Sequence, residues 1–390
     1  MSPSRPGETW RGFGNLESGP GSLREQIQTV LSKVDFQHLQ KVALRTRLTQ
    51  DETADPDISC IIDPSTFTHE FNNVVLEVSF SDHVYWIAKI QYTSVDASKA
   101  SSNTMDIKSE LATMRTVKAR TNIPVPQLPI ASKVPFNHLR KVAKQLAEVL
   151  FQLCGLHFDH LGQLWCSEDC DKPPEIIPVG PNNARPPSLT PQTSLEWFYA
   201  HRQDQNRRSL KDHSDDPEWR TACWVLKTAV PYIINEDRVH GPFPLCHVDL
   251  HHGNLLFDDD FNLKGVIDWS QAQTVPIERL VVSPEFIPFP AGSPETNTKI
   301  LTFRSYIREH LQKCTVDKQH LEKTKCAANK VSPTLLSHIF GSKPADITHR
   351  CTYSLPHRAV FDGKLVAHLI YGDNIKWEQL VRVYGEMKIY

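Results

Sequence analysis

The sequence has no long apolar run and no excess of charge of one sign. No stretch approaches the roughly 20 consecutive apolar residues that a membrane-spanning helix needs. The 43 lysines and arginines nearly balance the 45 aspartates and glutamates, which gives a formal net charge of −2. Because no overall basic field would attract nucleic acid or an anionic bilayer, we expect neither of them as a partner.

The amino-terminal residues also lack the apolar core of a secretory signal. Glu8 and Glu17 weakly disfavour a mitochondrial leader, since acidic residues are scarce in such segments. Hydrophobic residues make up 39% of the chain and charged residues 23%, which is typical of a globular protein. We therefore expect a cytoplasmic protein, with a mitochondrial location as the less favoured alternative.

The nine cysteines show no repeated CxxC spacing. Cys166 and Cys170, with His157 and His160 just upstream, would allow a metal site. Zinc sites usually bring tighter spacing, however, so we favour free thiols in a reducing compartment.

The amino-terminal part of the chain changes from a helical to a strand-like pattern. Residues 1–21 are rich in Gly, Pro and Ser and are predicted to be disordered. Residues 22–57 carry apolar positions at helical spacing. β-Branched and aromatic runs at 74–80 and 84–90, separated by a turn, then predict a hairpin.

The rest of the chain is predicted to be mainly helical, with a proline-rich surface loop at 171–193. Apolar residues recur at helical spacing over 104–119, 136–156, 195–203, 219–230, 300–311, 335–340 and 377–384. We therefore predict an α+β fold with two unequal lobes, a strand-rich N-lobe at 58–132 and a helical C-lobe at 133–390.

The most informative stretch lies at 245–269 and reads LCHVDLHHGNLLFDDDFNLKGVIDW. Two short apolar runs on either side of a cluster of turn-forming residues predict a tight hairpin. Side-chain oxygens of Asp249, Asn254 and Asp268 would converge at one end of this hairpin. Such a set suits a hard cation such as Mg²⁺.

This spacing matches the kinase pattern of phosphoryl transfer. There an aspartate accepts the proton of the acceptor hydroxyl, while an asparagine five positions later and an aspartate beyond a hairpin hold Mg²⁺. Asp249, Asn254 and Asp268 would take these roles, and His247 would brace the loop by hydrogen bonding. An ordinary surface hairpin is the alternative, but it does not account for the whole combination.

A kinase site also needs a strand lysine for the phosphates and a helix glutamate to hold that lysine. Alone, Lys89 would be a polar residue on the exposed face of a sheet, and Glu110 a solvated helix charge. Their order along the chain before Asp249 favours the functional interpretation, with Glu77 as a weaker competitor for Glu110.

These residues resemble the aminoglycoside phosphotransferase-like kinases, the family that includes choline kinase-type enzymes, in the branch abundant in fungi. The similar segments are 84–90, 109–126, 142–164, 247–258 and 265–278. The resemblance implies a protein-kinase-like fold and ATP- and Mg²⁺-dependent phosphorylation of a hydroxyl group on a small molecule. Known members of the family act on aminoglycosides, choline and sugars.

Two features depart from the family pattern. The loop at 64–73 contains no glycine, so its backbone amides would approach phosphates less closely. No pair of strand-like runs lies between Pro126 and Phe136, where the family has the hinge that holds adenine. The alternative function is therefore a pseudokinase or scaffold with a defective nucleotide pocket. A protein kinase is disfavoured, since no APE-like segment follows Asp268.

Overall fold

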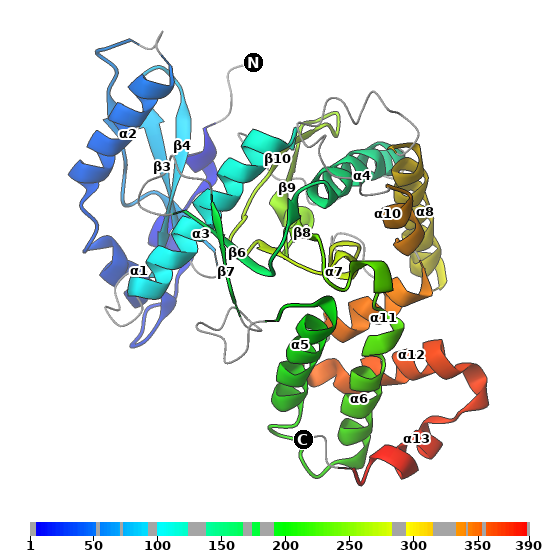
Figure 1. Cartoon of the computed structure of the whole chain (residues 1–390). Coiled ribbons are helices and arrows are strands. Elements are labelled where there is room, and N and C mark those ends of the chain that lie inside the picture. Colours follow the sequence, from blue (N-terminus) through cyan, green and yellow to red (C-terminus); the bar gives the residue numbers. More distant parts are fainter. Residues whose placement is uncertain are drawn as a thin grey trace. The chain divides into compact units, whose positions relative to one another are not determined.

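The computed structural model divides the chain into two compact units, Met1–Met105 and Asp106–Tyr390 (Figure 1). Each unit is described by itself below. The structure describes residues 5–51, 55–70, 73–92, 100–123, 138–166, 174–179, 191–282, 294–314, 333–340, 342–352 and 356–387.

Unit 1 is built around a four-stranded antiparallel sheet. Its strands are β1 (Cys60–Ile61), β2 (Phe67–His69), β3 (Asn73–Phe80) and β4 (Tyr85–Gln91). The long strand β3 pairs with β4 along one edge and with β1 and β2 along the other. The predicted hairpin at 74–90 is thereby confirmed. Two helices, α1 (Leu23–Leu31) and α2 (Phe36–Gln50), lie in the segment expected to be helical.

The register of β3 and β4 gives the sheet two chemically different faces. On one face, Leu76 lies opposite Ala88 and packs into the core shared with α1 and α2. The alternating residues of the other face form what we call the Lys89 face, which consists of Val75, Glu77, Ser79, Tyr85, Ile87 and Lys89. The side chain of Lys89 thus belongs to a defined surface of unit 1.

Residues 5–21 contain regular structure, although residues 1–21 are predicted to be disordered. They include two short 3-10 turns, Pro6–Thr9 and Gly12–Asn15. The Arg5 side chain and the Gly7 amide both bind Glu77 on β3, and the ring of Phe13 packs edge-on against Phe67. The contact between Arg5 and Glu77 joins positions 72 residues apart, so local composition carried no sign of it.

Unit 2 combines a five-stranded sheet, a β-hairpin and most of the helices. The sheet has the order β5 (His157–Phe158), β8 (Phe243–Cys246), β11 (Gln273–Thr274), β6 (Gly162–Trp165) and β7 (Glu175–Ile177). The hairpin consists of β9 (Leu255–Phe257) and β10 (Leu263–Val266) and confirms the strands expected there. Strand β7 corrects the prediction that 171–193 contains no regular element.

The helices of unit 2 largely confirm the sequence pattern. They are α3 (Ala100–Arg120, which begins in unit 1), α4 (Leu139–Cys154), α5 (Ser194–Ser209), α6 (Pro217–Thr228), α7 (Ile277–Leu280), α8 (Pro294–Cys314), α10 (Pro333–Ile339), α11 (Lys343–Thr352), α12 (Ala359–Tyr371) and α13 (Trp377–Tyr384). With a strand-rich unit 1 and a mainly helical unit 2, the predicted α+β fold class is confirmed.

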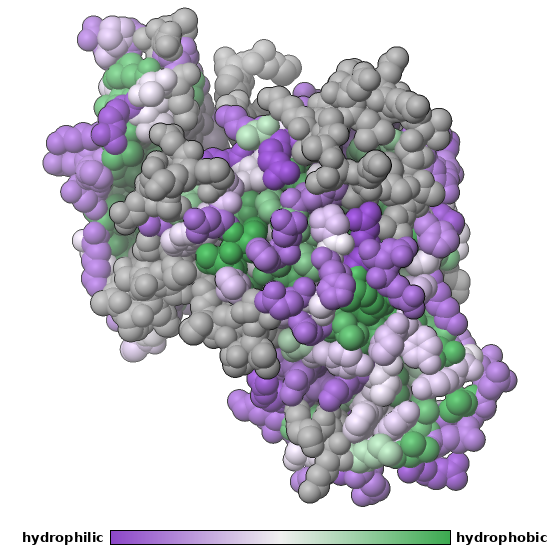
Figure 2. Space-filling model, in the orientation of Figure 1, coloured by the Kyte–Doolittle hydropathy of each residue, from purple (hydrophilic) through white to green (hydrophobic). Residues whose placement is uncertain are grey.

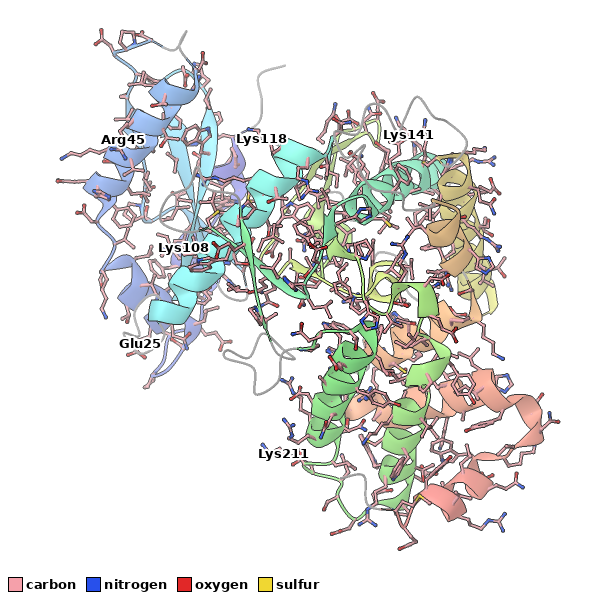
Figure 3. The ribbon with its side chains drawn as sticks, viewed as in Figure 1. Glu25, Arg45, Lys108, Lys118, Lys141 and Lys211 are labelled. Atoms are coloured by element: carbon pink, nitrogen blue, oxygen red, sulfur yellow. The ribbon has the colours of Figure 1, made fainter. Side chains whose placement is uncertain are left out.

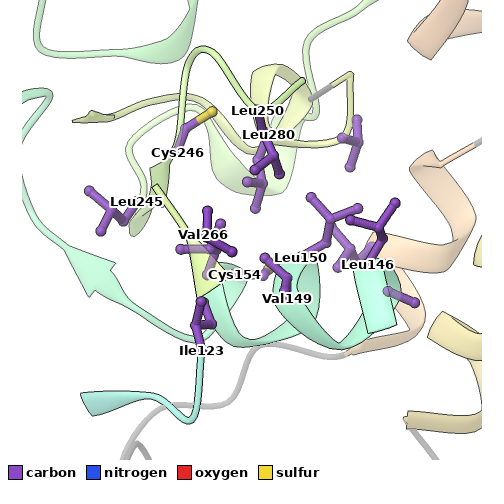
Figure 4. Packing of buried hydrophobic residues seen from close by; sticks show 14 of the residues in the cluster. Ile123, Leu146, Val149, Leu150, Cys154, Leu245, Cys246, Leu250, Val266 and Leu280 are labelled. Atoms are coloured by element: carbon purple, nitrogen blue, oxygen red, sulfur yellow. The ribbon is translucent and has the colours of Figure 1, made fainter. Parts of the chain in front are cut away.

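The main core of unit 2 surrounds β8 and the segment that follows it (Figure 4). Three side chains are fully buried there: Leu245 of β8, Val266 of β10 and Leu146 of α4. Leu150 of α4 is almost fully buried. Leu250, four residues beyond β8, is also fully buried. This apolar side chain anchors the middle of an otherwise polar segment, and its truncation to Ala would cost about 2–5 kcal/mol.

Three sequence-based predictions fall outside the described residues: the missing hinge between 126 and 136, the lobe boundary at 132–133, and the metal interpretation of Cys170. On the face drawn in Figure 2, hydrophilic residues cover most of the described surface and hydrophobic ones form scattered patches. Within the described part of the chain, no helix is both long and apolar enough to cross a bilayer.

Candidate active site

The site begins with His247, which directly follows β8 and is only 1% exposed. Its Nε2–H donates to the carbonyl oxygen of Ile267 at 2.8 Å, and its ring packs edge-on against Trp269. Burial lowers the pKa of the His247 imidazole. The neutral ring therefore holds the strand end at Ile267 and is poorly suited to act as a base.

Asn254 joins the two halves of the site. Its side-chain Nδ2 donates to the backbone oxygen of Asp249 at 2.7 Å. Its own backbone oxygen accepts from the amide of Ile267 at 3.0 Å. These two bonds tie the loop that carries Asp249 to the residue before Asp268. Because Nδ2 is used inside the loop, the side-chain oxygen of Asn254 remains available as a ligand atom.

Asp249 is the exposed member of the loop, with a side chain that is 53% accessible. The Nδ1 atom of His251 accepts from the amide of Gly253 at 2.9 Å, so Nε2 carries the ring proton of the neutral tautomer. Nε2 lies 3.6 Å from Oδ2 of Asp249. Gly253 allows this arrangement, since a Cβ there would lie 2.7 Å from the His251 ring.

Asp268 is held by its neighbours on both sides. Its φ angle of +58° is rare for a residue with a Cβ. The backbone of Ile267 before it is bound through its oxygen by His247 and through its amide by Asn254. After it, the hydroxyl of Ser270 donates to Oδ1 of Asp268. The carboxylate thus has a fixed backbone and a fixed side-chain partner.

Helix α4 secures the turn of the hairpin. Gln145 donates to the carbonyl oxygen of Phe261 at 2.9 Å and accepts from the amide of Leu263 at 2.6 Å. Lys141, labelled in Figure 3, donates to the carbonyl oxygen of Asp260 at 2.7 Å. The hairpin that leads from Asn254 to Asp268 is therefore attached to α4, whose apolar face is buried in the core.

Helix α7 contacts the same loop from another side. The guanidinium of Arg279 donates to the carbonyl oxygen of Val248, the residue before Asp249, at 3.4 Å. Next to it, Glu278 is 2% exposed and accepts from the amide of Asn235 at 2.5 Å. Burial raises the pKa of the Glu278 carboxyl to about 7.

The structure gives Lys89 a partner that sequence reasoning did not single out. Its Nζ lies 3.0 Å from Oε2 of Glu70, just after β2, and both side chains are about 40% exposed. Glu77, the weaker candidate for the glutamate partner of Lys89, is instead bound by the amino-terminal segment and is 4% exposed. Glu110 lies half-buried on α3 in unit 2, so its pairing with Lys89 of unit 1 stays a prediction.

The donor set at Asn254 and Asp268 fits a magnesium ion. Among the described residues, no group of three His, Cys, Asp or Glu side chains could hold a metal alone. Mg²⁺ typically takes one or two carboxylates together with substrate phosphates and water, so one carboxylate and one amide oxygen suffice. The oriented amide of Asn254 and the fixed carboxylate of Asp268 meet this requirement.

Sequence reasoning missed four supporting residues. His251 stood in the polar stretch without a role, although the following Gly253 signals a close approach. Ser270, Gln145 and Glu70 gave no such signal, because each acts through a partner that only the fold brings near.

Comparison with curated proteins finds none that matches the chain. Three solved structures are similar over most of their length. A macrolide 2′-phosphotransferase of Brachybacterium faecium has 12% identity and a TM-score of 0.38, covering 86% of this chain and 99% of that one. A Plasmodium vivax ethanolamine kinase has 11% identity and a TM-score of 0.40, with 96% coverage of both chains. A protein described as a fructosamine-3-kinase from Thermobifida fusca has 16% identity and a TM-score of 0.44, covering 83% and 98%.

At these identities and TM-scores, the solved structures do not assign the chain to a family. A model described as "Phosphotransferase enzyme family" matches residues 102–277. The matched region contains His247, Asp249, Asn254 and Asp268 together with the hairpin and α4. Residues 102–277, which carry the candidate site, are therefore similar to the phosphotransferase enzyme family.

Proposed function

We propose that the protein transfers the γ-phosphoryl group of ATP, with Mg²⁺, to a hydroxyl group of a small molecule. The observation that carries the proposal is the double link through Asn254, which binds the oxygen of Asp249 at 2.7 Å and the amide of Ile267 at 3.0 Å. This link ties a proton acceptor to the segment of a metal ligand, which is the arrangement that phosphoryl transfer requires.

In this mechanism Asp249 accepts the proton of the acceptor hydroxyl. The hydroxyl oxygen forms a bond to the γ-phosphorus, the bond between that phosphorus and the β–γ bridging oxygen breaks, and ADP leaves. The Nε2–H of His251, 3.6 Å away, helps to hold the Asp249 carboxylate in one orientation. General-base assistance of this kind contributes about 10²- to 10⁴-fold in rate.

Three residues would bind the charged end of the nucleotide. Asn254 and Asp268 would hold Mg²⁺, and Lys89 would hold the phosphates. Bound Mg²⁺ supplies positive charge that stabilises the phosphoryl oxygens and the leaving group. The pair between Lys89 and Glu70 is half exposed and thus weak, at about 0–1 kcal/mol, so phosphate can displace it.

The test is ADP formation by the full chain with Mg-ATP and a panel of hydroxyl acceptors. The panel includes a macrolide, an aminoglycoside, ethanolamine, choline and a fructosamine. We expect turnover with one class and a fall of about 10²- to 10⁴-fold for Asp249→Asn. Asp259→Asn, an exposed carboxylate in the turn of the same hairpin, is the control and should retain activity. Equal rates for Asp249→Asn and the unaltered protein would rule this mechanism out.

A scaffold without turnover is the second candidate. The glycine-free segment before β3 and the engagement of Lys89 by Glu70 favour it, because both weaken phosphate binding. The two candidates differ in nucleotide binding, which is the subject of the last experiment in the Discussion.

A further inference from the structure

The Lys89 face of the unit 1 sheet carries a buried carboxylate with an unusual set of partners. Glu77 accepts from Nε of Arg5 at 2.6 Å, from the amide of Gly7 at 2.5 Å and from the hydroxyl of Ser79 at 2.5 Å. Two of the three donors come from the amino-terminal turn at 5–9. A strand carboxylate is therefore used to hold an extra segment on this face of the sheet.

The segment reaches the face by passing around the edge of the sheet at the turn before β2. Gly12, with φ +51°, lies there, and a Cβ would fall 2.1 Å from the backbone oxygen of Ser65. On the opposite face, Phe13 packs against Phe67, and Arg24 of α1 donates to the carbonyl oxygen of Phe13 at 3.0 Å. Residues 12–16 are thus anchored in the core, while residues 5–9 rest on the Lys89 face.

Glu77 and Lys89 are diagonal neighbours on adjacent strands. Val75 lies opposite Lys89 and Glu77 opposite Ile87, so two positions separate them along the pairing. Diagonal neighbours of an antiparallel pair are about 7–8 Å apart. A nucleotide whose phosphates bind Lys89 is larger than this separation, so one that extends toward Glu77 along this face would meet Arg5 and Gly7.

We propose that residues 5–9 form a cap in cis that competes with the nucleotide for the Lys89 face and is held closed by Arg5 and Gly7 on Glu77. This inference rests on the proposed function and adds regulation of nucleotide binding to it. Arg5 is 53% exposed, whereas Glu77 is 4% exposed, so the arginine is the partner that can swing away into water. The cap lowers apparent nucleotide affinity by the fraction of molecules in which it is closed.

The experiment compares nucleotide binding by full-length variants. Arg5→Ala removes the charged donor to Glu77, and Arg11→Ala removes an exposed arginine of the same segment as the control. Isothermal titration with Mg-AMP-PNP should show binding that is about 3- to 10-fold tighter for Arg5→Ala than for the unaltered protein. Arg11→Ala should bind like the unaltered protein.

Hydrogen exchange in the unaltered protein gives a second measurement. Saturating Mg-AMP-PNP should speed exchange over residues 5–9, because displacement of the cap releases the amide of Gly7. Equal or weaker binding by Arg5→Ala, or exchange that slows with nucleotide, would overturn the cap. Failure of every variant to bind Mg-AMP-PNP would instead refute the nucleotide site itself, and the cap with it.

Discussion

At the scale of single residues, the site depends on side chains that hold backbone rather than substrate. His247 is neutral and buried and binds the oxygen of Ile267, and Asn254 binds the oxygen of Asp249. His247 thus holds the backbone next to Asp268, and Asn254 holds the backbone of Asp249 itself. The positions of the Asp249 and Asp268 carboxylates therefore depend on these two hydrogen bonds.

Replacement of His247 tests this dependence. His247→Gln keeps an N–H donor for the Ile267 oxygen, whereas His247→Leu fills the space without one. We expect Leu to cost about 1–3 kcal/mol in free energy of unfolding, since a buried carbonyl is left unpaired, and Gln to cost less. Denaturant unfolding measures both. A Leu variant as stable as the Gln variant would show that the bond has no structural value.

Glu278 gives a pH-dependent stability at the same scale. Its pKa is about 7 in the folded chain and about 4.5 when unfolded, so the folded state binds more protons between these values. Stability is therefore fully present below about pH 4.5 and decreases as the pH rises to about 7. The loss is on the order of 3 kcal/mol.

The measurement compares unfolding free energies at pH 5 and pH 8 for the unaltered protein and Glu278→Gln. Gln keeps the acceptor for the Asn235 amide but does not titrate. We expect the unaltered protein to lose more stability than the variant over this range. Parallel pH profiles would mean that Glu278 is already ionised in the folded chain at pH 5.

At the scale of elements, the β9–β10 hairpin and α4 act as one support for the site. The hairpin is attached to Gln145 by two hydrogen bonds and to Lys141 by a third. Phe261, in the turn, has a φ angle of +58°, which α4 helps to maintain through the bond to its oxygen. Movement of this turn would shift β10 and with it Asp268.

Gln145→Ala should therefore loosen the hairpin. Loss of two hydrogen bonds worth about 0.5–1.5 kcal/mol each predicts a cost of about 1–3 kcal/mol. Gln145→Glu keeps the acceptor for Leu263 and should cost less, and Lys144→Ala, an exposed change on the same helix, should cost little. Hydrogen exchange of the Leu263 amide reports the change directly. Unchanged protection in Gln145→Ala would show that the turn holds itself.

The sequence predicted those elements that local pattern specifies. The hairpin was found because two apolar runs flank turn-forming residues, and α4 because its apolar face repeats over four turns. Strands β5, β6 and β7 were missed, since two to four residues show no periodicity and their partners lie far along the chain. The turns at 5–15 were missed because Glu77 and Phe67, which contact them, belong to another part of the sequence.

At the scale of the whole molecule, the residues proposed to bind the nucleotide belong to different units: Lys89 belongs to unit 1, and Asn254 and Asp268 belong to unit 2. The local sequence of one unit does not predict the binding residues of the other unit. Ligand-induced stabilisation of the full chain is therefore a more direct test of the proposed function than the behaviour of either unit.

Thermal unfolding with Mg-AMP-PNP distinguishes an enzyme from a scaffold. A ligand at about 100 times its Kd adds about 2.7 kcal/mol to the stability of the state that binds it. We expect a rise in Tm for the unaltered protein and a smaller rise for Asp268→Asn, because an amide binds Mg²⁺ less strongly than a carboxylate.

Asp260→Asn, an exposed carboxylate in the turn that α4 holds, is the matched control and should respond like the unaltered protein. The same rise for Asp268→Asn would remove Asp268 from the metal site, and no rise at millimolar nucleotide in any variant would favour the scaffold, since the Lys89 face would then bind no phosphate.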